Sequence, residues 1–157
     1  MPDYHTLICL SFWTSPKLMT EPCDLTAVAA RRLIGAKKQA KAAEKQVMRG
    51  NDLGLLHGLP AGIKDLNPVA GLRSTWGSLL FKDHVPDEDD PMVANVRAAG
   101  ANIFAKTNTP EFGAGANTRN RVYGATTNPF DTKLTPAGSS GGNSMPVMAR
   151  GLRRGVA

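Results

Sequence analysis

The chain has 157 residues, which is enough for one domain with a buried core. Its composition, 41% hydrophobic and 20% charged, is that of an ordinary soluble protein. The net charge of +6 is concentrated in residues 31–50, where seven cationic side chains accompany a single carboxylate, that of Glu44. Such a stretch can bind nucleic acid, but without interleaved aromatic residues a solvated helix face is the favoured interpretation, and no nucleic acid partner is expected.

The cysteine count and the apolar runs exclude several classes of protein. Two cysteines, Cys9 and Cys23, make neither a disulfide framework nor a metal site. The apolar run at residues 7–13 is too short to span a bilayer, and no basic residue precedes it as in a signal peptide. Three scattered histidines show no metal-ligand spacing. We therefore expect a cytoplasmic protein with no membrane partner, no metal and no cofactor.

The first fifty residues divide into two parts. Residues 1–23 show no usable periodicity and form an unrecognised N-terminal extension. Asp24 is a good N-cap, and the hydrophobic spacing after it predicts a helix that continues to about Met48. Gly35 interrupts this pattern, so the helix could consist of two pieces. We assign residues 24–50 to a basic helical segment.

A strand, a helix and a second strand are predicted next. Residues 59–64 alternate as in a short strand with Lys64 at its end, and residues 66–90 are typical of a loop. Asp90 is then an N-cap and the proline after it occupies the first helical position, so a helix begins there and ends at Gly100. A second strand follows at residues 101–106. This order at this spacing predicts a parallel α/β layer.

The remaining chain is a long loop region that contains a Gly/Ser segment, residues 135–142. Two serines between glycines place hydroxyl groups on a backbone that can approach a ligand closely, although such a run is more often a flexible linker. Lys64 has two interpretations as well. A lysine at a strand end usually reaches solvent, but a partly buried one can lose its proton and act as a base.

Taken together, several segments resemble the amidase signature family in order and spacing. They cover roughly residues 53–144 and are jointly highly specific; they are residues 58–65, 70–78, 96–101, 106–112, 128–131 and 135–142. The resemblance implies an α/β fold in which helices flank a mixed sheet, present here as a partial amidase-signature fold that is incomplete as given. Residues 51–144 would form the core fragment of that fold.

The resemblance also implies site residues. Lys64 matches the base of a Ser–Ser–Lys triad, and Ser139 matches the middle serine, which relays a proton and follows an unusual cis peptide bond. Ser140, Gly141 and Gly142 would support the loop around it. A serine hydroxyl becomes a good nucleophile when a base takes its proton, and the family then forms an acyl-enzyme that water hydrolyses. The implied partner of the full-length enzyme is a small-molecule amide.

The end of the chain departs from the family pattern. The family's nucleophile lies about two dozen residues beyond the middle serine, and no nucleophile is expected within this chain. Residues 145–157 contain Arg150, Arg153 and Arg154 where the family has an alanine-rich helix, so we assign them to a divergent arginine-rich tail. A truncated or frame-shifted reading frame is the favoured explanation, and this fragment alone is expected to be inactive.

Three functions stay open at this point. The first is an amidase that hydrolyses the C–N bond of carboxylic amides. The second is the amidase subunit of a transamidosome, which releases ammonia from glutamine. The third is a non-catalytic pseudoenzyme or interaction module that carries a basic helix. Neither the substrate nor the oligomeric state can be read from these residues.

Overall fold

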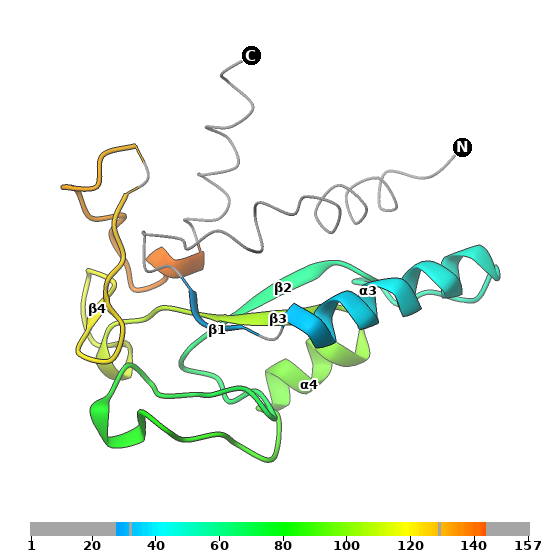
Figure 1. The fold of residues 1–157 in the computed structure, drawn as a ribbon, viewed down its shortest axis with the longest axis horizontal. Helices are drawn as coiled ribbons and strands as arrows, with labels where there is room; N and C mark the ends of the chain where they lie inside the picture. The colour runs from blue at the N-terminus through cyan, green and yellow to red at the C-terminus, as the bar shows by residue number, and fades with distance from the viewer. Residues whose placement is uncertain (1–27, 32, 129, 144–157) are drawn as a thin grey trace.

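A computed structural model describes residues 28–31, 33–128 and 130–143 (Figure 1). The longer elements follow in the order β1 (Val28–Arg31), α3 (Leu33–Met48), β2 (Pro60–Lys64), α4 (Pro91–Ala98) and β3 (Asn102–Thr107). The extension predicted at residues 1–23 and the tail predicted at residues 145–157 lie outside the described residues. In the described part of the chain, no helix is long and apolar enough to cross a membrane.

The three longer strands form one mixed sheet in the order β1–β3–β2. β2 and β3 run parallel, and Lys64 pairs with Thr107 where both strands end. β1 pairs with the other edge of β3 in the antiparallel direction. The unit β2–α4–β3 therefore confirms the parallel α/β layer that the strand–helix–strand order predicts.

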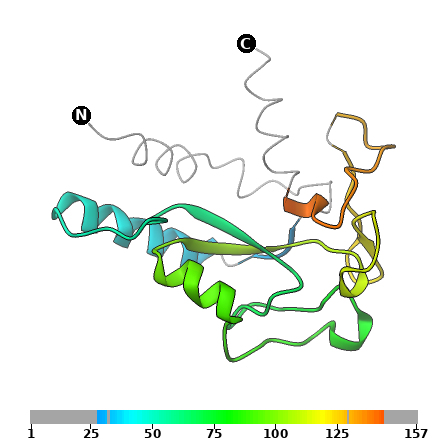
Figure 2. The same ribbon diagram turned by 180° about the vertical axis from the view of Figure 1, so that it is seen from behind.

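The two faces of this sheet are covered by different parts of the chain. α4 packs on one face over a hydrophobic cluster, whose members are Ile63, Val69, Leu72, Val93 and Ile103. Side chains alternate along a strand, so Lys64 and Asn102, the neighbours of two cluster members, point to the opposite face. There the Asn102 side-chain amide donates a hydrogen bond of 2.8 Å to the carbonyl of Ala36 in α3. Figures 1 and 2 show α4 and the orange segment near residue 140 on opposite sides of the strands.

The predicted start of the first helix is wrong. Asp24 lies outside the described residues, but residues Val28–Arg31 form β1 where the prediction has helix, and α3 begins at Leu33. The hydrophobic spacing of this stretch suits a helix. However, the edge of β3 offers it a row of backbone hydrogen bonds that no local pattern reveals, and tertiary pairing of this kind overrides a weak local propensity.

The rest of this helix agrees with the sequence. α3 is continuous through Gly35 and ends at Met48, and Gly50 follows with a φ of 68°, the left-handed conformation that commonly ends helices. Several of its lysines are exposed, as expected of a solvated helix face; they are Lys37, Lys38, Lys41 and Lys45.

α4 begins and ends where its sequence signals lie. The Asp90 carboxylate accepts a hydrogen bond of 2.8 Å from the backbone N–H of Met92, and Pro91 occupies the first turn. Gly100 follows the helix with a φ of 93°. The acidic run before α4 does more than cap it, because Asp89 forms an ion pair of 2.7 Å with Arg97.

Two long loops are fastened to each other by aromatic side chains. The first loop contains the 3-10 turn Leu79–Phe81, and the second contains the 3-10 turn Glu111–Gly113 and the short strands β4 (Arg119–Asn120) and β5 (Gly124–Ala125). The rings of Phe81 and Phe112 meet edge to face across the two loops, with centroids 6.3 Å apart. The backbone N–H of Phe112 also donates to the carbonyl of Trp76 at 2.7 Å. Both loops are thus held at the end of the sheet where Lys64 lies.

Candidate active site

Lys64 and Ser139 meet although 75 residues separate them in the chain. The Lys64 amine donates a hydrogen bond of 2.6 Å to the Ser139 hydroxyl oxygen. This contact brings together the two residues that the family resemblance names as base and relay. β2 supplies the lysine as its last residue, and the Gly/Ser segment supplies the serine from a loop over the same face of the sheet.

The surroundings of Lys64 favour its neutral form. Its side chain is half-buried, and it forms no ion pair with any of the described residues. Burial therefore lowers the pKa of the Lys64 amine below its ordinary value of 10.5, because removing water penalises the charged ammonium form. At a given pH a larger fraction of this amine is unprotonated than for a surface lysine, so Lys64 is more often available to act as a base.

The backbone around Ser139 has an unusual conformation. The peptide bond between Gly138 and Ser139 is cis, as the family resemblance implied. Ala137 precedes it with a φ of 64°, a left-handed conformation that is uncommon for residues other than glycine. A Cβ atom at Gly138 would lie only 2.9 Å from the carbonyl oxygen of Ala116, so the loop approaches its neighbour too closely for a side chain there.

One threonine contacts the Ser139 loop on both sides of the serine. The Thr118 hydroxyl donates to the Ala137 carbonyl at 3.2 Å and accepts from the Gly141 N–H at 2.9 Å. Thr118 is 1% exposed. The sequence gives no sign of this contact, because an isolated threonine in a Gly/Asn/Thr-rich stretch has no distinguishing pattern.

Ser140, Gly141 and Gly142, which the family resemblance predicts to support the loop, differ in their exposure to solvent. Gly141 is buried, and a Cβ atom on it would lie 2.7 Å from the Thr118 hydroxyl oxygen. Gly142 is buried as well, whereas Ser140 is exposed and its carbonyl accepts a hydrogen bond of 2.9 Å from the N–H of Asn143. The structure thus brings Gly141 into the packing of the loop and leaves the Ser140 side chain near solvent.

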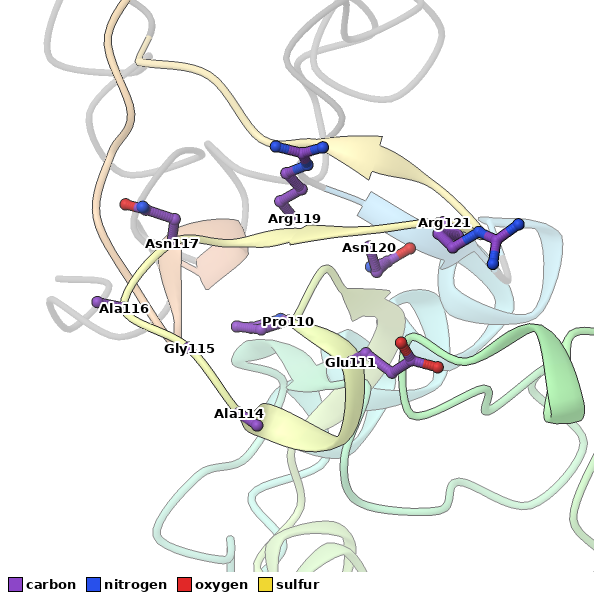
Figure 3. Close-up of a pocket in the computed structure, with 9 residues that line it drawn as sticks. All are labelled: Pro110, Glu111, Ala114, Gly115, Ala116, Asn117, Arg119, Asn120 and Arg121. Atoms are coloured by element: carbon purple, nitrogen blue, oxygen red, sulfur yellow. The ribbon is translucent and has the colours of Figure 1, made fainter.

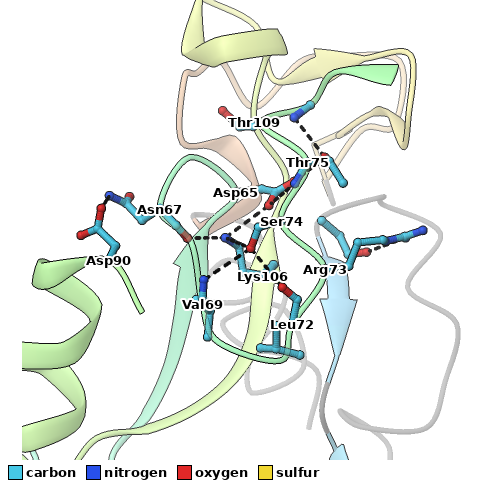
Figure 4. A network of polar contacts seen from close by, with 12 residues as sticks. Asp65, Asn67, Val69, Leu72, Arg73, Ser74, Thr75, Asp90, Lys106 and Thr109 are labelled. Atoms are coloured by element: carbon cyan, nitrogen blue, oxygen red, sulfur yellow. Dashed lines mark hydrogen bonds and ion pairs between the residues drawn. The ribbon is translucent and has the colours of Figure 1, made fainter. Parts of the chain in front are cut away.

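A second lysine lies behind the site on the α4 side of the sheet. Lys106 of β3 forms an ion pair of 3.2 Å with Asp65, the residue after Lys64, and both side chains are completely buried (Figure 4). The Lys106 amine also donates to the Asn67 carbonyl and, at 3.1 Å, to the Ser74 hydroxyl. Burial lowers the pKa of Lys106, and the Asp65 carboxylate opposes this shift.

Asp65 has further partners that hold the end of β2. Its carboxylate accepts hydrogen bonds from the Thr75 hydroxyl at 2.6 Å and from the Thr75 N–H at 3.1 Å. Its own N–H donates to the Thr107 carbonyl at 2.9 Å, which continues the pairing of β2 with β3 beyond Lys64. The sequence analysis missed this ion pair, although a lysine directly after the apolar residues 103–105 indicates an amine that needs a buried partner.

An open cavity of about 390 Å³ lies beside the Ser139 loop (Figure 3). Its lining residues are Pro110, Glu111, Ala114, Gly115, Ala116, Asn117, Arg119, Asn120 and Arg121. Ala116 belongs both to this lining and to the backbone against which Gly138 packs. Among the described residues no group of three histidine, cysteine or carboxylate side chains could hold a metal ion.

The fold and the site define the class of protein. A parallel α/β layer carries a half-buried lysine at the end of one strand, and this lysine contacts a serine that follows a cis peptide bond. A model of the Amidase family matches residues 24–156, which is most of the chain. The chain belongs to this amidase family, and the resemblance of its motifs is confirmed.

Individual relatives agree with this assignment. The chain is 39% identical over 134 residues to a glutamyl-tRNA(Gln) amidotransferase subunit of Desulforapulum autotrophicum, covering 85% of this chain and 27% of the relative. It is 42% identical over 125 residues to an indoleacetamide hydrolase of Bradyrhizobium diazoefficiens, covering 80% and 24%. The chain therefore spans about a quarter of the length of these relatives.

A solved structure shows the same fold. The native peptide amidase of Stenotrophomonas maltophilia superposes with a TM-score of 0.74 at 28% identity. The match covers 93% of this chain and 31% of that chain. The predicted α/β amidase-signature fold is thus confirmed for the part of the fold that this chain represents.

Proposed function

We propose that this chain supplies the proton-transfer part of an active site that hydrolyses carboxylic amides, with Lys64 as the base and Ser139 as the relay. The observation that carries this is the 2.6 Å contact between the Lys64 amine and the Ser139 hydroxyl. When the amine is neutral, the same contact allows Ser139 to donate its proton to Lys64. Ser139 can then accept a proton from an attacking hydroxyl group.

The environment of Lys64 supports this role. A base must be unprotonated when it acts, and burial lowers the pKa of the Lys64 amine. The Ser139 loop is ordered by packing against Ala116 and by hydrogen bonds to Thr118, so the hydroxyl has a fixed position. We assign the attacking group to none of the described residues. The net reaction would consume one water and convert the amide into a carboxylate and an ammonium ion.

The relatives support a second candidate function, that of an amidotransferase component. The relatives include a simple amide hydrolase at 42% identity and a component of an amidotransferase at 39% identity. In this second candidate function, the chain belongs to an amidotransferase and uses the same proton transfer to release ammonia from glutamine within a larger assembly. Lys64 and Ser139 cannot distinguish the two, because both reactions hydrolyse a carboxylic amide.

The pKa of Lys64 is the direct test. Lysine labelled with ¹³C at Cε reports each amine by NMR, and the Lys64→Met variant identifies the signal of interest. We expect Lys64 to titrate below 10.5, the ordinary value for a lysine amine. A Lys64 signal that titrates at 10.5 or above would overturn the role of Lys64 as the base.

Activity can be tested in a chimera. Residues 58–142 of this chain would replace the matching segment of the Bradyrhizobium relative, and ammonia release would be measured with simple amides and with glutamine. In that chimera Lys64→Met should lower kcat by roughly 10²–10⁴-fold, the usual contribution of general acid–base catalysis. Lys82→Met is the matched control and should leave kcat unchanged. Equal activity in both variants would contradict the assignment.

A further inference from the structure

The Ser139 loop, residues 137–141, has little regular structure of its own. Residues 137–140 belong to neither a helix nor a strand, and a short helical turn begins only at Gly141. Ser139 itself is half-buried and its hydroxyl is used in the contact with Lys64. The loop must therefore be held by residues outside it.

Thr118 is placed to hold the loop at two points. Its hydroxyl donates to the Ala137 carbonyl, two residues before Ser139, and accepts from the Gly141 N–H, two residues after it. A hydroxyl group can donate one hydrogen bond and accept another through the same oxygen atom. The Gly141 N–H is buried, so without Thr118 it would lose its partner at a free-energy cost.

Thr118 is itself anchored away from the loop. Its carbonyl accepts a hydrogen bond of 2.9 Å from the backbone N–H of Thr126, and its side chain is 1% exposed. The preceding residues contribute as well: the Asn117 side-chain oxygen accepts from the Thr135 hydroxyl at 3.2 Å. Residues 116–118 thus form a fixed support on which the loop rests.

We propose that Thr118 is a positioning residue that holds Ser139 against Lys64 through its two hydrogen bonds to the flanking backbone. This inference rests on the proposed function, because it concerns the contact between the base and the relay. The hydrogen bonds of the Thr118 hydroxyl go to the loop backbone and not to either side chain of that pair. It acts on them through the path of the loop backbone.

The test compares three variants of the full chain. Thr118→Val keeps the shape of the side chain and removes the hydroxyl, whereas Thr118→Ser keeps the hydroxyl. Thr109→Val is the matched control, since Thr109 is also completely buried but its hydroxyl has no hydrogen-bond partner among the described residues. Two quantities are measured in each: the hydrogen exchange rate of the Gly141 amide and the pKa of Lys64 by NMR.

In Thr118→Val we expect the Gly141 amide to exchange about tenfold faster, the ratio that corresponds to one net hydrogen bond. We also expect the pKa of Lys64 to return toward 10.5, because a displaced loop admits water to the amine. Thr118→Ser should restore both values to those of the original chain, and Thr109→Val should change neither. If Thr118→Val does not fold, Thr118→Cys replaces it with the same expectation, since a thiol forms weaker hydrogen bonds.

The possible results distinguish a failure of the positioning role of Thr118 from a failure of the proposed function. If Gly141 exchanges faster in Thr118→Val while the pKa of Lys64 stays lowered, Thr118 is merely structural and the positioning role is refuted. If neither quantity changes, that role is refuted as well, and the proposed function is unaffected. If Lys64 of the original chain does not titrate below 10.5, the proposed function fails, and the role of Thr118 fails with it.

Discussion

Replacing Lys106 by methionine should destabilise the chain more than any surface substitution. Methionine fills a similar volume but leaves the Asp65 carboxylate completely buried without its counter-ion, which lies 3.2 Å away in the original chain. The hydrogen bonds from Lys106 to the Asn67 carbonyl and to the Ser74 hydroxyl are lost as well. Two donors from Thr75 remain on the carboxylate and cannot neutralise its charge.

The expected loss of unfolding free energy follows from the complete burial of both side chains. Removing one partner of a completely buried ion pair costs about 3–5 kcal/mol of unfolding free energy. For a chain of this length such a loss lowers Tm by roughly 6–20 °C. Urea unfolding followed by circular dichroism measures the free energy, and differential scanning calorimetry measures the shift in Tm.

Two further variants make the experiment decisive. Lys82→Met removes an exposed lysine that lies 3.9 Å from Asp83, and it should cost less than about 0.5 kcal/mol. The double variant Asp65→Asn with Lys106→Met removes both charges and should recover most of the loss, because the uncompensated charge is gone. A single Lys106→Met variant that loses less than about 1 kcal/mol would refute the reasoning, since the pair would then behave as a solvated one.

Three smaller predictions concern the strand end, the helix cap and the loop. Between the lowered pKa of Lys64 and 10.5, the unfolded chain binds more protons than the folded chain, so the free energy of unfolding of the original chain rises with pH in that window. The Lys64→Met variant lacks this amine and should not show that rise. Urea midpoints across the alkaline range test this, and parallel profiles would contradict it. Asp90→Ala should lower the free energy of unfolding by about 1 kcal/mol, because it removes the side chain that caps the N–H of Met92, whereas Asp90→Asn should lower it little. Urea unfolding measures both, and equal losses would show that the cap is unimportant. Gly141→Ala should displace the Ser139 loop, because the new Cβ would lie 2.7 Å from the Thr118 hydroxyl oxygen. NMR chemical-shift changes should then be confined to the loop and its neighbours, and changes spread over the whole sheet would contradict this local effect.

Elements with strong local signals could be predicted from the sequence. The cap at Asp90, the proline after it and Gly100 define α4 almost without reference to the rest of the chain. The alternation that ends at Lys64 likewise predicts β2. The meeting of Lys64 with Ser139 was predictable only through the family resemblance, because nothing local in either segment indicates the other.

Features that depend on distant partners could not be predicted. β1 exists because residues 28–31 pair with an edge of β3 that lies more than seventy positions later in the chain. The hydrogen bonds of Thr118 depend on where the Gly/Ser segment passes, and the ion pair of Lys106 depends on Asp65 being carried to the same side of the sheet. In each case the deciding interaction is between segments whose own patterns suit several structures.

The 75-residue separation between Lys64 and Ser139 has a consequence for the synthesis of the chain. A ribosome adds about 5–20 residues per second, so Lys64 emerges roughly 4–15 s before the serine that covers it. During this interval the amine is not yet covered by Ser139, and in its first part β2 also lacks β3, its parallel partner, because residues 102–107 emerge after Lys64 but before Ser139. Because pairings between distant segments form slowly, the nascent chain presents an open strand to its surroundings for seconds. Chaperone contacts at that strand would therefore precede the formation of the site.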